Sequence, residues 1–103
     1  MSYKMYIDDI RNPKEPSYYR IVRNSDAAIK MMESFGCPDF ITFDHDLGGE
    51  DTSMSVIKWM IEKDLDMHGM FIPIDFEYSV HSANPVGSGN IESMLESYLK
   101  SRK

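Results

Sequence analysis

Three short segments of the chain combine carboxylates, imidazoles and hydroxyls in a way that suits metal and phosphate chemistry. They are YIDDIR with Asp8, Asp9 and Arg11, FDHDLGG with Asp44, His45 and Asp46, and HSANPVG with His81, Ser82, Asn84 and Gly87. An isolated pair of aspartates is usually a solvated turn. Carboxylates that are brought close together instead raise one another's pKa or recruit a cation. If the three segments meet in the fold, they predict a site for chemistry.

The acidic residues predict a Mg²⁺ site. Mg²⁺ prefers oxygen ligands, keeps several waters and bridges to phosphate oxygens. The predicted metal ligands are Asp8, Asp9, Asp44 and Asp46. Along an extended chain Asp44 and Asp46 would point to one side and His45 to the other. We therefore expect at most two of these three groups to share the site.

The segment HSANPVG predicts a phosphate-binding turn at the start of a helix. Ser82 and Asn84 supply a hydroxyl and an amide, and Pro85 suits the first helical turn. Gly87 allows close approach of the backbone, and a helix N-terminus presents free N–H groups to an anion. The alternative is an ordinary capped helix start. Arg11 could clamp a phosphate with two hydrogen bonds.

The two histidines of these segments are candidates for proton transfer. His81 could act as a general acid or base, as a ligand, or as a strand-end residue bonded to the backbone. His45 either takes part in the chemistry or orients its neighbours. Arg23 is expected to be a surface residue of a strand. The chain has no phosphate-binding P-loop, no GxGxxG, no GxSxG and no Cys/His spacing typical of zinc.

Alternating strand and helix patterns predict how these segments are positioned. Strands are expected at residues 4–8, 20–23, 40–43 and 74–81, and helices from residue 25 to Gly36, around 56–61 and over 91–99. The order β-β-α-β-α-β-α predicts a three-layer α/β domain with a mostly parallel, four-stranded sheet. Residues 1–103 are expected to form a single domain. The first connection carries Pro13 and Pro16 and is expected to replace a helix with an irregular loop.

In an open parallel sheet, ligands bind beyond the carboxyl ends of the strands. Each of the three polar segments follows a predicted strand, so all three are expected to converge at this edge. This convergence is the strongest functional signal in the sequence.

Bulk properties restrict the partners. The chain has 103 residues and a net charge of −6 without a basic block, which argues against extended nucleic-acid binding. A phosphate-bearing small molecule or one RNA terminus remains compatible. A single cysteine, no apolar leader and no run of roughly 20 apolar residues favour a cytoplasmic protein that does not enter a membrane.

Together the three segments resemble the receiver-like domain family named for cyclic-phosphate processing, a shortened relative of the receiver domains of two-component signalling. The resemblance runs from about residue 4 to residue 98. It implies that Asp8 and Asp9 match the acidic pair of receivers, that Asp44 matches the phosphoacceptor aspartate, and that His81-Ser82 loosely match the hydroxyl residue. The chain departs from receivers in lacking a helix after the first strand and a fifth strand that ends in lysine.

The sequence therefore predicts a metal-dependent phosphoryl-transfer or phosphohydrolase domain that processes a cyclic phosphate or a terminal nucleotide phosphate, as in RNA end repair. Asp44, His81 and His45 are the predicted catalytic residues. Arg11, Ser82, Asn84 and Gly87 are the predicted substrate-binding residues. The alternative is a non-catalytic receiver-like module that binds a phosphorylated ligand or a partner protein in signalling.

Overall fold

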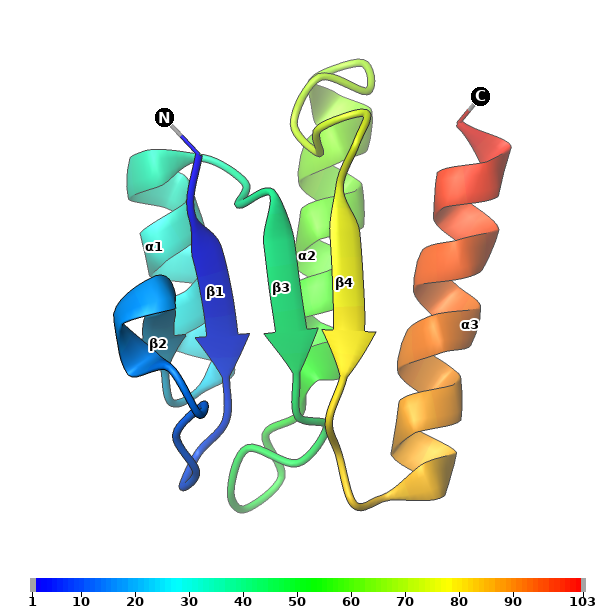
Figure 1. Ribbon diagram of the computed structural model, residues 1–103. Helices are drawn as coiled ribbons and strands as arrows, with labels where there is room; N and C mark the ends of the chain where they lie inside the picture. The colour runs from blue at the N-terminus through cyan, green and yellow to red at the C-terminus, as the bar shows by residue number, and fades with distance from the viewer. Residues whose placement is uncertain (1, 103) are drawn as a thin grey trace.

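The computed structural model describes residues 2–102 and shows a four-stranded parallel sheet with three helices (Figure 1). The strands are β1 (Lys4–Ile7), β2 (Arg20–Val22), β3 (Phe40–Phe43) and β4 (Glu77–Val80), in the spatial order β2-β1-β3-β4. The helices are α1 (Ser25–Phe35), α2 (Ser53–Asp66) and α3 (Pro85–Ser101), and a short 3₁₀ turn, η1, spans Pro16–Tyr18. The predicted α/β class and the parallel sheet are confirmed.

The hydrophobic core lies between the sheet and the helices. Met5 and Ile7 of β1 and Ile41 and Phe43 of β3 are in register and fully buried. Their side chains project from the same face because residues two apart in a strand share a face. In Figure 1, α1 and α2 lie behind the sheet, while α3 lies beside β4 and also contacts α2.

An irregular segment covers part of the front face of the sheet. Residues 8–19 leave the end of β1 and turn back toward the start of β2, and η1 lies in front of the sheet (Figure 1). Tyr19 packs edge-on against Tyr6 of β1 and also approaches Phe40 of β3. The front layer is thus formed by the loop that was expected to replace a helix.

Side-chain caps define where the helices begin. Asn24 accepts a hydrogen bond from the backbone N–H of Ala27 at the start of α1, and Thr52 accepts one from Met54 at the start of α2. Gly36 ends α1 with φ of 83°, a left-handed conformation that favours glycine. These boundaries agree with the known preferences of Asn and Thr for the first position of a helix and of Gly for its end.

Strand β4 is shorter than its apolar alternation predicts. The pattern suggested residues 74–81, whereas β4 starts at Glu77 and Ile74 is 99% exposed. The N–H of Phe76 donates to the carbonyl of Pro73, so Ile74 belongs to a turn whose side chains need not alternate between faces. β4 lies at an edge of the sheet, next to β3.

A buried polar network joins α2, the segment before β4 and the end of α3. The carboxylate of Asp64 is fully buried and accepts hydrogen bonds from the backbone N–H groups of Phe71 and Ile72 and from the Tyr98 hydroxyl. Arg102 forms an ion pair with it at 3.2 Å. Every polar partner is satisfied here, so the network holds an irregular segment against two helices.

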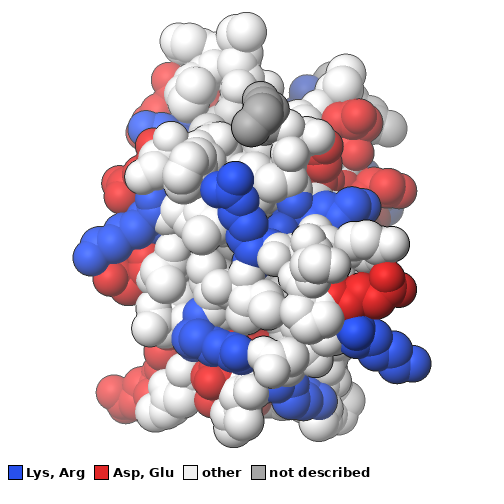
Figure 2. Space-filling model, turned by 60° about the vertical axis from the view of Figure 1, so that its left-hand side comes forward, with Lys and Arg blue, Asp and Glu red and all other residues white. Residues whose placement is uncertain are grey.

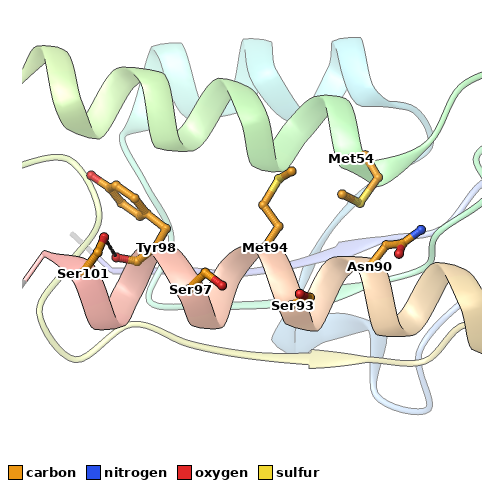
Figure 3. Close-up of a pocket in the computed structure, with 7 residues that line it drawn as sticks. All are labelled: Met54, Asn90, Ser93, Met94, Ser97, Tyr98 and Ser101. Carbon is orange, nitrogen blue, oxygen red and sulfur yellow. Dashed lines mark hydrogen bonds between the residues drawn. The ribbon is translucent and has the colours of Figure 1, made fainter.

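A hollow of about 620 Å³ lies along α3 beside the start of α2 (Figure 3). It is lined by Met54, Asn90, Ser93, Met94, Ser97, Tyr98 and Ser101. It contains none of the acidic or imidazole groups that the sequence singles out, so we assign no chemistry to it. No helix within residues 2–102 has the length and apolar character needed to cross a membrane.

Candidate functional site

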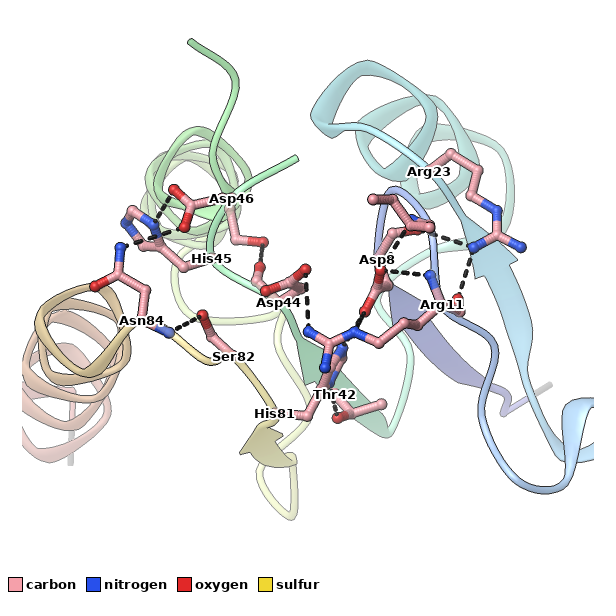
Figure 4. Close-up of polar contacts among 12 residues, drawn as sticks. Asp8, Arg11, Arg23, Thr42, Asp44, His45, Asp46, His81, Ser82 and Asn84 are labelled. Carbon is pink, nitrogen blue, oxygen red and sulfur yellow. Dashed lines mark hydrogen bonds and ion pairs between the residues drawn. The ribbon is translucent and has the colours of Figure 1, made fainter. Parts of the chain in front are cut away.

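Three residues from separate strand ends meet at the carboxyl edge of the sheet (Figure 4). Asp8 follows β1, Asp44 follows β3 and His81 follows β4. Each offers one atom suited to bind a metal, and these atoms all lie within 4.8 Å of one another. Because β1, β3 and β4 run parallel with matched register, their ends bring these side chains to one place.

Asp8 is held as a buried carboxylate. It is 1% exposed, and its Oδ1 accepts hydrogen bonds from the backbone N–H groups of Ile10 (2.9 Å) and Arg11 (2.8 Å). Burial acts to raise the pKa of Asp8. The hydrogen bonds from these N–H groups and from His81 outweigh that effect and bring the pKa below its usual value. Asp8 is therefore ionised at neutral pH.

His81 uses both ring nitrogens within the protein. Its Nε2 lies 3.0 Å from Asp8 Oδ2, and its Nδ1 lies 2.7 Å from the hydroxyl oxygen of Thr42. An ionised carboxylate can only accept, so Nε2 carries a proton and donates to Asp8. In the neutral ring Nδ1 then accepts from Thr42. The ring also stacks on Tyr6 with a centroid distance of 4.5 Å, which fixes its plane.

Arg11 spans the two carboxylates. Its Nε lies 3.2 Å from Asp8 Oδ2 and its terminal nitrogen 3.7 Å from Asp44 Oδ2. Asp44 is 7% exposed, and its backbone carbonyl accepts a hydrogen bond from the Ser53 hydroxyl at the start of α2. The Arg11 side chain is 54% exposed, so it can exchange these partners for a bound anion.

A second polar group forms beside the first. His45 Nδ1 donates to Asp46 Oδ1 (3.0 Å), and the Asn84 amide donates to Asp46 Oδ2 (3.2 Å), as Figure 4 shows. These hydrogen bonds hold the pKa of Asp46 below its usual value. Asp46 therefore lies with His45 and outside the group of Asp8, Asp44 and His81. The alternation expected for residues 44–46 does not continue because β3 ends at Phe43.

Gly87 is required by the close approach of His45. A Cβ atom on Gly87 would lie 2.7 Å from both Cδ2 and Nδ1 of the His45 ring, which is closer than packed atoms approach one another. The N–H of Gly87 donates to the side-chain oxygen of Asn84, so Asn84 is the N-cap of α3. That N–H is thus engaged in capping, and the Ser82 hydroxyl accepts from the N–H of Asn84.

Asp9 lies next to the group but is not part of it. A Cβ atom added to Gly48 would lie 3.7 Å from Asp9 Oδ2. The Asp9 carboxylate therefore lies against the loop that follows β3. Asp9 is half-buried, whereas Asp8 is fully enclosed. The two aspartates of YIDDIR therefore have different surroundings, and Asp8 is the one that meets Asp44 and His81.

Sequence reasoning missed two residues that position the site. Arg23, expected to be a surface residue, donates to the backbone carbonyls of Asp8 (3.1 Å) and Arg11 (2.7 Å). Thr42 orients His81. The available signal for Thr42 was a polar residue within an otherwise apolar strand. Arg23 had no such signal because its partners lie 12 and 15 residues away.

The donor set fits a divalent cation. Two buried carboxylates and one imidazole converge at this point. Among the described residues, no lysine forms an ion pair with either carboxylate, and Arg11 is the arginine that pairs with both. Carboxylate oxygens suit Mg²⁺, and the imidazole extends the fit to Mn²⁺. Asp8 and Asp44 would hold the ion. His81 could join them through Nε2 if the ring proton moved to Nδ1, where the Thr42 hydroxyl can accept it.

The fold and the site define a small parallel α/β domain of receiver-like architecture with an acidic centre at the carboxyl edge. The family model for the cyclic-phosphate processing receiver domain matches residues 3–97, so the chain belongs to that family. Searches of curated proteins and of solved structures found no match.

Proposed function

We propose that the chain is a metal-dependent phosphoryl-transfer domain that opens a cyclic phosphate or removes a terminal nucleotide phosphate. One observation carries the proposal: in a member of a cyclic-phosphate processing family, two buried carboxylates and an imidazole converge from three strand ends. A role in processing cyclic phosphates is what the family name implies. The metal, the reaction and the RNA-repair setting are parts of our proposal.

Asp8 and Asp44 would hold a divalent cation such as Mg²⁺, with His81 and Asp9 close by. A bound cation supplies charge neutralisation at the phosphate oxygens and polarises the phosphorus centre. Arg11 would turn from the carboxylates to a phosphate oxygen, where its planar group can form two hydrogen bonds. Its partly exposed side chain supports this role.

Opening a cyclic phosphate with water breaks one P–O bond, forms another and leaves a proton on the released hydroxyl. Asp44 would either complete the metal site or attack phosphorus and form an aspartyl phosphate that water then hydrolyses. His81 could pass a proton at Nε2 only if the metal were held by Asp8 and Asp44 alone, because a nitrogen that binds a metal carries no proton. His45 directs Nδ1 to Asp46, and no buried nitrogen or oxygen of the described side chains lacks a partner. The Nε2 of His45 therefore reaches solvent. Because Nδ1 carries the proton, Nε2 of the neutral ring can only accept a proton, and His45 could donate one from Nε2 only as an imidazolium.

The test is incubation with an oligonucleotide that ends in a 2′,3′-cyclic phosphate. Ring opening should require Mg²⁺ and stop with EDTA, and Asp44→Asn should lower the rate by about 100-fold or more. Asp75→Asn is the matched control, since Asp75 is an exposed aspartate before β4. Turnover that persists with EDTA and in Asp44→Asn would refute the metal–aspartate mechanism.

A second function is favoured by the position of Arg11. Because Arg11 already pairs with both carboxylates, the site is partly charge-balanced without a metal and could simply receive a phosphate group. The chain would then be a receiver-like module that binds a phosphorylated ligand or a partner protein. Tight binding of the cyclic-phosphate oligonucleotide with no turnover in Mg²⁺ or Mn²⁺ would support this alternative.

A further inference from the structure

The front face of the sheet carries a hollow of about 340 Å³ under the loop that replaces a helix. Its lining includes Tyr6, Asn12, Tyr18, Tyr19, Thr42 and Ser79. The hollow thus combines three aromatic rings with an amide and two aliphatic hydroxyls. A few polar groups placed among rings are typical of pockets for small organic ligands, and the volume lies in their range.

The hollow and the acidic centre share a wall. Tyr6 stacks on His81, and Thr42 is hydrogen-bonded to the same ring, while both residues also line the hollow. Asn12 follows Arg11 directly in the chain. The hollow and the acidic centre are therefore neighbours, with the His81 ring between them.

The charge on this side of the molecule favours an anionic ligand. Five of the eleven Lys and Arg residues lie between residues 4 and 23, together with three acids, although the whole chain carries −6. Figure 2 turns the β2 side of the molecule forward and shows Lys and Arg side chains spread over this face. The lining of the hollow itself includes both Lys14 and Glu15, so the excess of cations lies around the hollow rather than in it.

We propose that the hollow binds the base of a nucleotide whose cyclic or terminal phosphate lies at the acidic centre. This rests on the proposed function and names its substrate class as nucleotides or RNA ends rather than simple cyclic phosphates. The Tyr18 ring is 65% exposed and offers a face on which a base can stack. Stacking on an aromatic side chain tolerates every base, so binding should depend on the presence of a base more than on its identity.

The experiment compares uridine 2′,3′-cyclic phosphate with glycerol 1,2-cyclic phosphate, which has the same five-membered ring and no base. Dissociation constants are measured by titration calorimetry with Mg²⁺, and ring opening is followed by ³¹P NMR. The wild type should bind the nucleotide about tenfold or more tightly than the glycerol compound. Tyr18→Ala should remove most of this difference, whereas Tyr18→Phe should keep it.

Phe35→Ala is the matched control, because Phe35 is an exposed aromatic residue at the far end of α1. It should preserve the preference for the nucleotide. Equal affinity of the wild type for both compounds, with both rings opened, would overturn the base pocket and leave the proposed function standing. If neither compound binds or is opened, the proposed function fails, and the base pocket fails with it.

Discussion

The contact between Gly87 and the His45 ring gives a sharp prediction about stability. A Cβ at residue 87 would meet Cδ2 and Nδ1 of His45 at 2.7 Å, whereas a Cβ at Gly89 in the same helix would meet nothing within 4 Å. Gly87→Ala must therefore push the His45 ring away from Asp46 or shift the start of α3. Gly89→Ala makes the same chemical change without that contact.

The expected magnitude follows from two opposing effects. Replacing glycine by alanine inside a helix stabilises it by about 0.5–1 kcal/mol, and this gain applies to both variants. Forcing an extra carbon into a packed contact costs about 1–3 kcal/mol, and this cost applies only at residue 87. Gly87→Ala should thus be less stable than Gly89→Ala by about 1–3 kcal/mol, which for a domain of this size is a difference in Tm of at least about 4 °C.

Urea unfolding of both variants, followed by circular dichroism, measures the difference in the free energy of unfolding. Adding His45→Ala removes the ring, so it should bring the Gly87→Ala variant close to the stability of His45→Ala alone. If Gly87→Ala proves as stable as Gly89→Ala, or if His45→Ala gives no rescue, the inferred role of Gly87 is refuted.

Three further predictions concern buried or paired groups. Burial acts to raise the pKa of Asp64, but hydrogen bonds from Tyr98 and two backbone N–H groups bring it below the usual value. Its contribution to stability is therefore present above a pH of about 4 and is lost as pH falls through the lower folded pKa. Asp64→Asn should cost about 3 kcal/mol at pH 7 and flatten the loss of stability below a pH of about 4. Urea unfolding at pH 7 and at a series of pH values below 4 tests this, and an unchanged pH profile would contradict it. Burial raises the pKa of the Cys37 thiol to about 12. Iodoacetamide at pH 8 should therefore modify Cys37 far more slowly in the folded protein than in urea, because the thiolate is the reactive form. Mass spectrometry measures both rates, and equal rates would contradict the effect of burial. Millimolar Mg²⁺ should raise the Tm of the wild type and of Asp75→Asn but not of Asp8→Asn in a thermal-shift assay, and an equal shift in all three would argue against a metal at Asp8.

Much of the fold could be predicted because its elements have local signals. Asn24 and Gly36 bracket α1 as capping rules require. The strand expected at residues 40–43 is β3, which lies between β1 and β4. The early start predicted for β4 came from Ile74, whose apolar side chain extends the alternation although it lies in a turn. Periodicity alone does not distinguish an apolar turn residue from a buried one.

The meeting of Asp8, Asp44 and His81 was also predictable, since parallel strands deliver their carboxyl ends to one edge. The separation of Asp46 from Asp44 was not, because it depends on where β3 stops and on a hydrogen bond to Asn84, 38 residues away. Such long-range pairings leave no periodic trace in a single sequence.

The hydrogen bonds of Arg23 determine which part of the loop between β1 and β2 can change in length. Arg23 holds the carbonyls of Asp8 and Arg11 from the end of β2, so the first residues after β1 are anchored independently of the rest of the loop. Tyr19, just before β2, is anchored by its contacts with Tyr6 and Phe40. The stretch between these anchors, around residues 13–17, can therefore be lengthened or recomposed while the carboxylates stay in place. Relatives or engineered variants could thus acquire new ligand preferences there by insertion, without rebuilding the acidic centre.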